Sequence, residues 1–266
     1  MKMIKNIFYT VKKESPILYS IVLLHAVLAV ICIGGIMIDD RTLFGVSVWI
    51  KPLKFWISGG IYILTVGFLI TKYPYSAKKK NIIRNIVSWT LLLETGIIFF
   101  QAARGVRSHY NQDSMFDGIL FAVMGILIAI NILIMILLAF DAARLKLTVA
   151  KPIQVAILLG WIVVIVGSWV GGQMINQLGH NVGMADGGKG LPLLNWSTVV
   201  GDLRVAHFVG LHGIQIIPLF AWILVRKWNT KTQNKTIAVL VFGVLFAACI
   251  AYVFYQAKQG IPLIKY

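Results

Sequence analysis

The stretch from Gly118 to Phe140, GILFAVMGILIAINILIMILLAF, contains no charged residue and decides the fold. Roughly 20 apolar residues in a helix, at about 1.5 Å per residue, cross the hydrocarbon core of a bilayer. A helix also satisfies its own backbone hydrogen bonds where no water is present. The sequence therefore predicts a transmembrane helix over 116–140.

Apolar runs of similar length fill the chain on both sides of this segment. They predict further spans over 16–37, 55–71, 87–104, 153–175, 200–225 and 237–256. The run over 55–71 is the shortest and lies between Lys54 and Lys72, so a re-entrant segment is its alternative. We predict an all-α fold, a polytopic transmembrane helix bundle of about seven spans, which forms a single transmembrane domain over 1–266.

The composition favours a membrane protein over a nucleic-acid-binding one. Hydrophobic residues make up 59% of the chain and charged residues 13%, whereas a soluble domain carries roughly 25% charged residues. The net charge of +16 comes mostly from Lys and Arg in short connections between apolar runs. Such residues contact anionic lipid headgroups, and no soluble basic module remains to bind nucleic acid. The expected partner is the lipid bilayer, while the oligomeric state is left open.

The distribution of basic residues predicts the orientation in the membrane. Connections rich in Lys and Arg face the cytoplasm, and the densest are the N-terminal segment and the segments 72–84 and 226–235. The N-terminus is therefore expected inside and the C-terminus outside. The first apolar run is too long for a signal peptide, so it is expected to remain as the first span. Most acidic residues fall in the connections predicted to lie outside.

The connection 176–201 differs from a simple linker. It is rich in glycine, so it must turn repeatedly, and its leucines and Trp196 give it an apolar side. We expect it to fold over the bundle as a lid or plug. Ser197 or Thr198 is expected to cap the next helix, where Asp202 also suits the helix dipole.

Three polar side chains lie on one face of the span 87–104. Glu94, Gln101 and Arg104 fall on one stripe of a helix that turns about 100° per residue. Ionisable groups inside a membrane cost several kcal/mol when they are unpaired. The stripe is therefore either an internal network that locks helix packing or part of a functional site.

The span 200–225 also carries a polar face. Within an arc of about 140° around a continuous helix lie Arg204, His207, His212 and Gln215. His207 and His212 occupy the two edges of this arc, so they do not share one metal ion unless the helix is broken. Gly210 and Gly213 permit close packing or such a distortion.

Three potential metal ligands fall at one depth on three spans. Glu94 and His212 lie about 15 Å from the predicted outer ends of their helices, and His25 comes out at the same level. A His, His, Glu set suits Zn²⁺ or iron. Haem is the second cofactor to consider, because histidines on facing helices bind it. The alternative is that each residue is a separate hydrogen-bonded packing residue.

A second polar group lies nearer the predicted outer face and is a candidate substrate mouth. It contains Gln101, Arg104, Arg107, His109, Asn111, Asp117, His180, Asp186, Asp202 and His207. Ordinary solvated loops are the alternative interpretation, above all for His109 and His180 taken alone.

These patterns lead to one preferred hypothesis and two alternatives. The preferred one is a membrane-embedded enzyme, dependent on a metal ion or haem, that acts on a small-molecule substrate from outside. Its catalytic residues would be Glu94, Arg104 and His207. Its substrate-binding residues would be Gln101, His109, Asn111, His180, Asp186, Arg204 and Gln215, and its metal ligands His25, Glu94 and His212. The alternatives are a small-molecule or proton-coupled transporter and a structural membrane subunit.

Three segments carry a family resemblance: ETGIIFFQAARGVRSHYN (94–111), HNVGMADGGKGLPLLNWS (180–197) and GDLRVAHFVGLHGIQ (201–215). They look similar to an uncharacterised family of bacterial polytopic inner-membrane proteins, and the resemblance spans most of the chain. It implies a multi-pass protein of the cell inner (plasma) membrane. It implies no activity.

Overall fold

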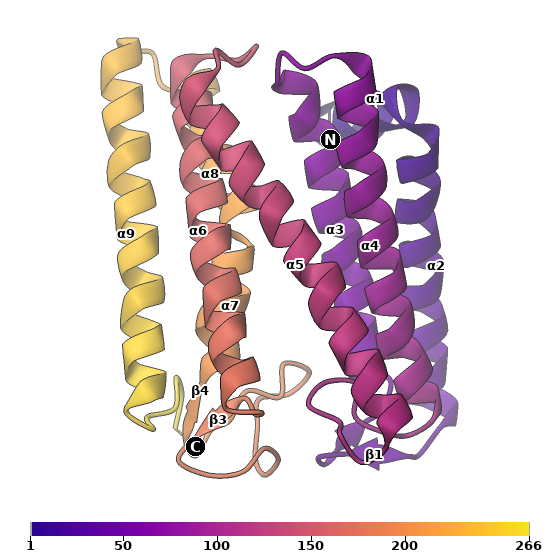
Figure 1. Cartoon of the computed structure of the whole chain (residues 1–266). Helices are drawn as coiled ribbons and strands as arrows, with labels where there is room; N and C mark the ends of the chain where they lie inside the picture. The colour runs from indigo at the N-terminus through magenta and orange to yellow at the C-terminus, as the bar shows by residue number, and fades with distance from the viewer. Residues whose placement is uncertain (1, 266) are drawn as a thin grey trace. The chain divides into compact units, whose positions relative to one another are not determined.

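The computed structural model describes residues 2–265, which are helical over most of their length (Figure 1). Met1 and Tyr266, the ends of the predicted domain over 1–266, lie outside the described residues. The chain divides into two compact units, Met1–Ile134 and Met135–Tyr266, which we call unit 1 and unit 2. Trp56 is buried in unit 1 and Trp161 in unit 2, so each unit has a core of its own.

Unit 1 begins with a helix that the apolar runs did not predict. α1 (Lys2–Glu14) mixes lysines with apolar residues and buries Val11 while Ile4 and Tyr9 stay exposed. It lacks the continuous apolar run of a span. The elements that follow are α2 (Pro16–Ile38), strands β1 (Thr42–Leu43) and β2 (Val46–Ser47), α3 (Ile50–Leu69), the 3₁₀ helix η1 (Ile70–Lys72), α4 (Ala77–Ala103) and α5 (Met115–Arg144). β1 and β2 form an antiparallel hairpin, and α5 continues past Ile134 into unit 2.

Unit 2 is built around α6. Its elements are the end of α5, α6 (Lys151–Asn176), β3 (Asn181–Val182), β4 (Gly201–Asp202), α7 (Leu203–Leu211), α8 (Gly213–Lys227) and α9 (Thr232–Lys258). α6 packs against α7, α8 and α9. β3 pairs antiparallel with β4, with Asn181 opposite Asp202, so the connection between them returns to the end of the bundle that it left.

The predicted fold class is confirmed. Among residues 2–265, six helices are long and apolar enough to cross a membrane, and the bent pair α7 and α8 makes up to seven. The six are Pro16–Ile38, Ile50–Lys72, Ala77–Ala103, Met115–Arg144, Lys151–Asn176 and Thr232–Lys258. The predicted segment 55–71 thus lies inside a longer candidate span. The chain is an integral, multi-pass helical membrane protein.

The span predicted over 200–225 consists of two helices with a break between them, the distortion that Gly210 and Gly213 were expected to permit. α7 ends at Leu211 and α8 starts at Gly213, with a bend of 46° between them. His212 is the residue at the break. Angles calculated for a continuous helix therefore do not relate His207 to Gln215 across it. Pro218 inside α8 removes one further backbone donor.

α6 and α7 approach each other until their backbones touch. A Cβ added to Gly167 would lie 2.8 Å from the carbonyl carbon of Gly210, and one added to Gly210 would lie 2.6 Å from the Cα of Gly167. Small residues at helix crossings permit such contact in membranes. On the same helix, added Cβ atoms on Gly160 and Gly171 would contact α8 and α7. We call Gly160, Gly167 and Gly171 the glycine seam.

Both cysteines are free. Cys32 on α2 is fully buried in the core of unit 1, where Ala29 and Trp56 surround it. Cys249 on α9 is exposed on the surface of unit 2. Neither thiol takes part in a disulfide.

Candidate functional site

Asp202 fastens the 177–202 loop to the start of α7. Its buried carboxylate accepts the backbone N–H of Ser197 at 2.8 Å and that of Arg204 at 2.9 Å. The Arg204 guanidinium donates to the same carboxylate at 2.6 Å and to the carbonyl oxygen of Asn195. Asp202 is therefore the N-cap, and neither Ser197 nor Thr198 fills that role. Arg204, predicted to bind substrate, is engaged inside this clamp.

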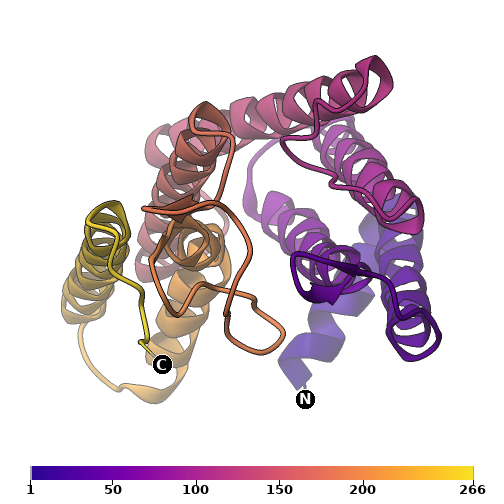
Figure 2. The same ribbon diagram turned by 90° about the horizontal axis from the view of Figure 1, so that it is seen from below.

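The loop folds back on the helices of its own unit (Figure 2). Trp196 packs edge-on against Phe208 of α7, with 5.5 Å between ring centroids. Leu193, at the tip of the apolar side, stays 68% exposed. The β3–β4 pairing, this aromatic contact and the Asp202 clamp thus hold the loop, while part of its apolar side stays exposed.

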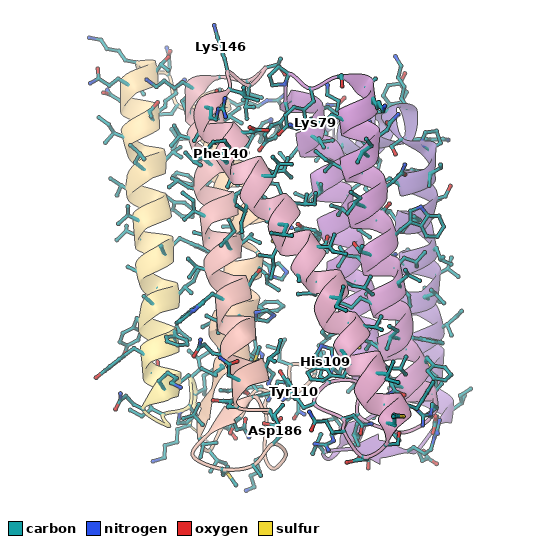
Figure 3. All side chains as sticks on the ribbon, viewed as in Figure 1. Lys79, His109, Tyr110, Phe140, Lys146 and Asp186 are labelled. Carbon is teal, nitrogen blue, oxygen red and sulfur yellow. The ribbon has the colours of Figure 1, made fainter. Side chains whose placement is uncertain are left out.

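His180 and Asp186 form a close pair within this loop (Asp186 is labelled in Figure 3). Nδ1 of His180 lies 2.5 Å from Oδ2 of Asp186, and the backbone N–H groups of His180 and Asn181 donate to Oδ1 at 2.8 and 2.9 Å. Burial raises the pKa of Asp186, but these hydrogen bonds and the charge of His180 outweigh it, so the pKa lies well below its usual range. The two predicted substrate-binding residues are brought together.

The pair is expected to open the loop at low pH. A carboxylate with a lowered pKa stabilises the fold above the pKa of the unfolded chain, about 4, and loses that contribution as the pH falls through the folded value. We expect Asp186→Asn at neutral pH to reproduce the acid behaviour of the wild type, with a loss of about 1–3 kcal/mol. Hydrogen exchange of residues 180–186, referenced to an unstructured peptide, measures this. Equal protection in Asp186→Asn and the exposed control Asp113→Asn would refute it.

His207 lies against the glycine seam. Its Nδ1 is 2.8 Å from the carbonyl oxygen of Gly167, and a Cβ on Gly171 would lie 2.9 Å from its Cε1. Because a carbonyl oxygen only accepts, Nδ1 carries the proton, and Nε2 of the neutral ring carries the lone pair. The helix crossing that the glycines create therefore fixes the tautomer and direction of this ring.

His212 sits at the break between α7 and α8. Its Nδ1 is 2.7 Å from the carbonyl oxygen of Phe208, whose ring lies 4.3 Å away, and its own carbonyl accepts the N–H of Gln215 at 3.1 Å. His207 is within electrostatic range of both His212 and His180. His207 thus interacts electrostatically both with the histidine at the break and with the one in the 177–202 loop.

In unit 1, His109 lies where the hairpin and the α4–α5 connection meet, far from Lys79 at the other end (Figure 3). Lys51 Nζ is 3.2 Å from its Nδ1, and Phe55 and Tyr110 pack around its ring. Asn111 is fully buried and uses its side chain on the backbone of its own loop. His109 and Asn111 were both predicted to bind substrate, but the Asn111 side chain serves the fold of the loop.

Arg104 and Gln101 are joined by Asp117 rather than by Glu94. The Gln101 amide donates to Oδ1 of Asp117 at 2.8 Å, and Arg104 donates to the same oxygen and to Oε1 of Gln101. Ser114 donates to Oδ2 at 2.6 Å. The network predicted as an internal lock exists, yet it closes around Asp117. Arg104, predicted to be catalytic, belongs to this lock.

Glu94 stands apart from that network. It lies on the buried face of α4 with 5% of its surface exposed, and its Oε2 has no hydrogen-bond partner among the described residues. An isolated carboxylate at such a place costs several kcal/mol. Of the predicted site residues, Glu94 is the one whose presence is least explained by helix packing.

His25 lies one helix away in the core of unit 1. Its Nδ1 is 2.9 Å from the carbonyl oxygen of Ile21, its ring meets Trp56 edge-on at 4.8 Å, and its Nε2 is 3.5 Å from Oγ1 of Thr95. Gly59 and Gly60 leave room for the imidazole. These contacts describe a well-packed residue.

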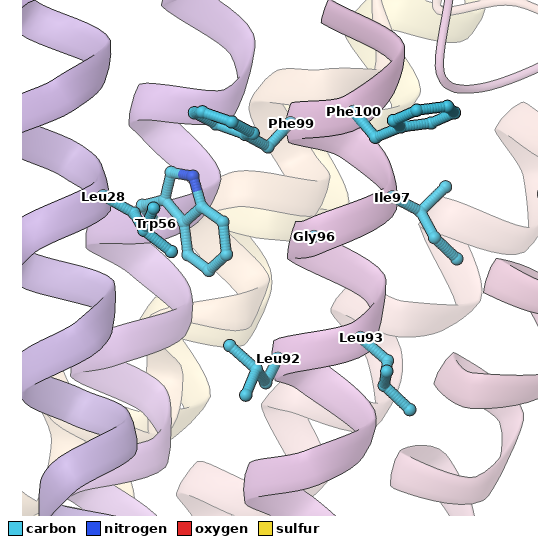
Figure 4. Close-up of a pocket in the computed structure, with 8 residues that line it drawn as sticks. All are labelled: Leu28, Trp56, Leu92, Leu93, Gly96, Ile97, Phe99 and Phe100. Atoms are coloured by element: carbon cyan, nitrogen blue, oxygen red, sulfur yellow. The ribbon is translucent and has the colours of Figure 1, made fainter. Parts of the chain in front are cut away.

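An apolar groove of about 410 Å³ opens on unit 1 beside this core (Figure 4). It is lined by Leu28, Trp56, Leu92, Leu93, Gly96, Ile97, Phe99 and Phe100. The indole N–H of Trp56 has no hydrogen-bond partner among residues 2–265. No ionisable side chain lines the groove, so it offers no reactive chemistry.

The predicted metal site receives no support. His25 and Glu94 belong to unit 1 and His212 to unit 2. Within the part of the chain that the structure describes, no three His, Cys, Asp or Glu side chains form a group that could hold a metal ion. The metal site was predicted because the three residues lie at similar heights along their helices. Similar height does not by itself bring side chains together.

Comparison with known proteins adds no relative: no family model matches the chain, and no curated protein or solved structure matches it either. The assignment of function therefore depends on the residues themselves. Arg84, a buried guanidinium near Glu14, was not among the predicted site residues. Sequence analysis also gave the glycine seam no part in placing His207. Arg84 had been counted only as a basic loop residue, and the spacing of the α6 glycines was the signal for the seam.

Proposed function

We propose that the chain is a proton-coupled membrane transporter in which Glu94 is the proton-binding group. The observation that carries the proposal is the buried carboxyl of Glu94 on a membrane-spanning helix, whose Oε2 has no hydrogen-bond partner among the described residues. A carboxyl group there is neutral with a proton and charged without one. The two forms therefore differ in their cost of burial by several kcal/mol, and this difference couples proton binding to conformation.

The broken span of unit 2 supports the same proposal. Transporters often bind their cargo where a spanning helix is interrupted, since the free backbone groups at the break serve as ligands. Here the interruption falls at His212, and Gln215 lies in the first turn of α8. Gln101 is not part of the proposed proton path, because its side chain is hydrogen-bonded to Asp117 and Arg104.

The proposal includes a location and an orientation. The basic connections favour an N-terminus inside and a C-terminus outside. The family resemblance favours the bacterial inner membrane. A small molecule would then enter from the end of each unit that carries His109 or the 177–202 loop.

Chemical labelling tests the state of Glu94 without knowledge of the cargo. Dicyclohexylcarbodiimide reacts with protonated carboxyl groups in apolar surroundings. We expect its adduct on the peptide that contains Glu94, with labelling that declines as the pH rises. Glu14, which is 45% exposed, is the internal control. A protein labelled at Glu14 but not at Glu94 would argue against the proposal.

Proton flux tests the function itself. In liposomes with a potassium diffusion potential and an internal pH-sensitive dye, we expect the wild type to acidify the lumen. Glu94→Gln should reduce the rate to that of protein-free liposomes, because the amide binds no proton, and Glu94→Asp should restore part of it. Asp40→Asn, on the exposed end of unit 1, should match the wild type. Full flux in Glu94→Gln would eliminate Glu94 as the carrier.

Haem binding is a second candidate function, favoured by one specific observation. Each histidine of the candidate spans places Nδ1 on a backbone carbonyl oxygen: His25 on Ile21, His207 on Gly167 and His212 on Phe208. This arrangement leaves Nε2 as the unprotonated nitrogen. Histidine side chains commonly bind iron through the ring nitrogen that carries no proton, while the other donates a hydrogen bond. An optical spectrum of the purified protein decides this candidate, since bound haem gives a Soret band.

A further inference from the structure

Arg84 is a buried cation whose donors are incompletely used. It lies in the second turn of α4, with its side chain 2% exposed. NH1 donates to the backbone carbonyl of Glu14 at 3.0 Å, and NH2 lies 3.6 Å from Oε2 of the same residue. Nε and NH2 have no hydrogen-bond partner among the described residues. Buried polar groups normally have partners, so this fork of donors points to an acceptor from outside the chain.

The surroundings of Arg84 carry an excess of positive charge. Lys72 at the end of η1 is in electrostatic contact with both Glu14 and Lys80. Glu14 interacts with two cations at this end of unit 1, Lys72 and Arg84, and Lys72 in turn is repelled by Lys80. A single half-exposed carboxylate does not balance them. The missing acceptor is therefore an anion.

The place of this cluster fits the level of lipid headgroups. η1 ends one candidate span and α4 begins the next, so Lys72 and Lys80 stand at the limit of the apolar region. Aromatic rings hold neighbouring lysines there: Lys79 lies 3.7 Å from the ring centre of Tyr75, and Lys72 lies 4.6 Å from that of Phe68. Tyrosine is enriched at membrane interfaces. These positions are typical of residues at the level of the lipid phosphate groups.

We propose that Arg84, with Lys72 and Lys80, binds a phosphate group, namely that of an anionic phospholipid headgroup at this end of unit 1. The planar guanidinium presents paired N–H donors that match phosphate oxygens, and the lysines add charge. Glu14 competes with the phosphate for Arg84 and so limits the affinity. Inorganic phosphate offers the same chemistry, and the experiment separates the two sources. The site is independent of Glu94.

Thermal unfolding of the full chain in detergent tests the site, with phosphatidylglycerol, phosphatidylcholine or inorganic phosphate as the probe. We expect phosphatidylglycerol to raise the melting temperature in a saturable way. Glu14→Gln should tighten binding, since it removes the competing carboxylate. Arg84→Gln should weaken it by roughly tenfold or more, as for a lost charge-assisted hydrogen bond. Lys146→Gln removes one exposed charge and should leave binding unchanged.

The outcomes separate the possibilities. Stabilisation by phosphatidylglycerol alone identifies a lipid site, and stabilisation by inorganic phosphate as well identifies a phosphate site open to water. If Arg84→Gln fails to fold, the affinity of Glu14→Gln for phosphatidylglycerol, compared with that of the wild type, still tests the proposal. Equal affinity in Glu14→Gln and the wild type, or equal loss in Arg84→Gln and Lys146→Gln, overturns the proposal, because general surface charge then explains the binding.

Discussion

Replacing Gly167 with alanine is expected to lower the free energy of unfolding of unit 2 by about 3 kcal/mol, and replacing it with leucine to prevent folding. The new Cβ would lie 2.8 Å from the carbonyl carbon and 2.9 Å from the Cα of Gly210. Both are backbone atoms, so no side chain can rotate out of the way. α6 and α7 would have to separate, and the hydrogen bond of His207 to the Gly167 carbonyl would be lost.

Denaturant unfolding in detergent, followed by the near-ultraviolet circular dichroism of the aromatic residues, measures this effect. The matched control is Gly172→Ala on the same helix, where an added Cβ meets no atom within 4 Å. Alanine suits a helix interior better than glycine by about 0.5–1 kcal/mol, so the control should be neutral or slightly stabilised. Similar losses in the two variants would show that α6 and α7 do not pack in contact.

Replacing Asp202 with alanine is expected to cost about 3 kcal/mol and to release the 177–202 loop. The carboxylate is fully buried and is bonded to two backbone N–H groups and to the Arg204 guanidinium. Removal of one partner of a buried ion pair costs about 3–5 kcal/mol, and Arg204 is 24% exposed, which favours the lower end. Without Asp202 the first turn of α7 also loses its cap.

Hydrogen exchange should locate this loss. Protection is expected to fall in residues 195–205 and to remain in α9. Asp202→Asn keeps one acceptor oxygen and should lose less than the alanine variant. Asp40→Ala, which alters an exposed carboxylate, should exchange like the wild type. Unchanged protection at residues 195–205 in Asp202→Ala would contradict the clamp.

The spans were predictable because the bilayer imposes one rule on every crossing. Apolar runs located each candidate span, with ends a few residues from those observed. This criterion did not predict α1, because lysines interrupt its apolar positions. The break at His212 was not predicted either, since composition does not distinguish one long helix from two short helices with a bend of 46° between them.

The candidate site was less predictable, because sequence gives the depth and direction of a side chain but not its partner. Glu94, Gln101 and Arg104 were expected on one stripe, yet Gln101 and Arg104 bond to Asp117 of the next helix while Glu94 does not. The Gly-rich loop was expected to cover the bundle, and its attachment depends on a strand pair and on the buried carboxylate of Asp202. Such choices depend on contacts between segments that are distant in the chain.

The two free cysteines give this protein a built-in reporter of its own unfolding. Cys249 is exposed on the folded chain and Cys32 is fully buried, so an alkylating reagent reaches Cys32 only after unit 1 opens. The mass spectrum of the alkylated chain then gives the fraction of molecules in which unit 1 has opened. No introduced label is needed.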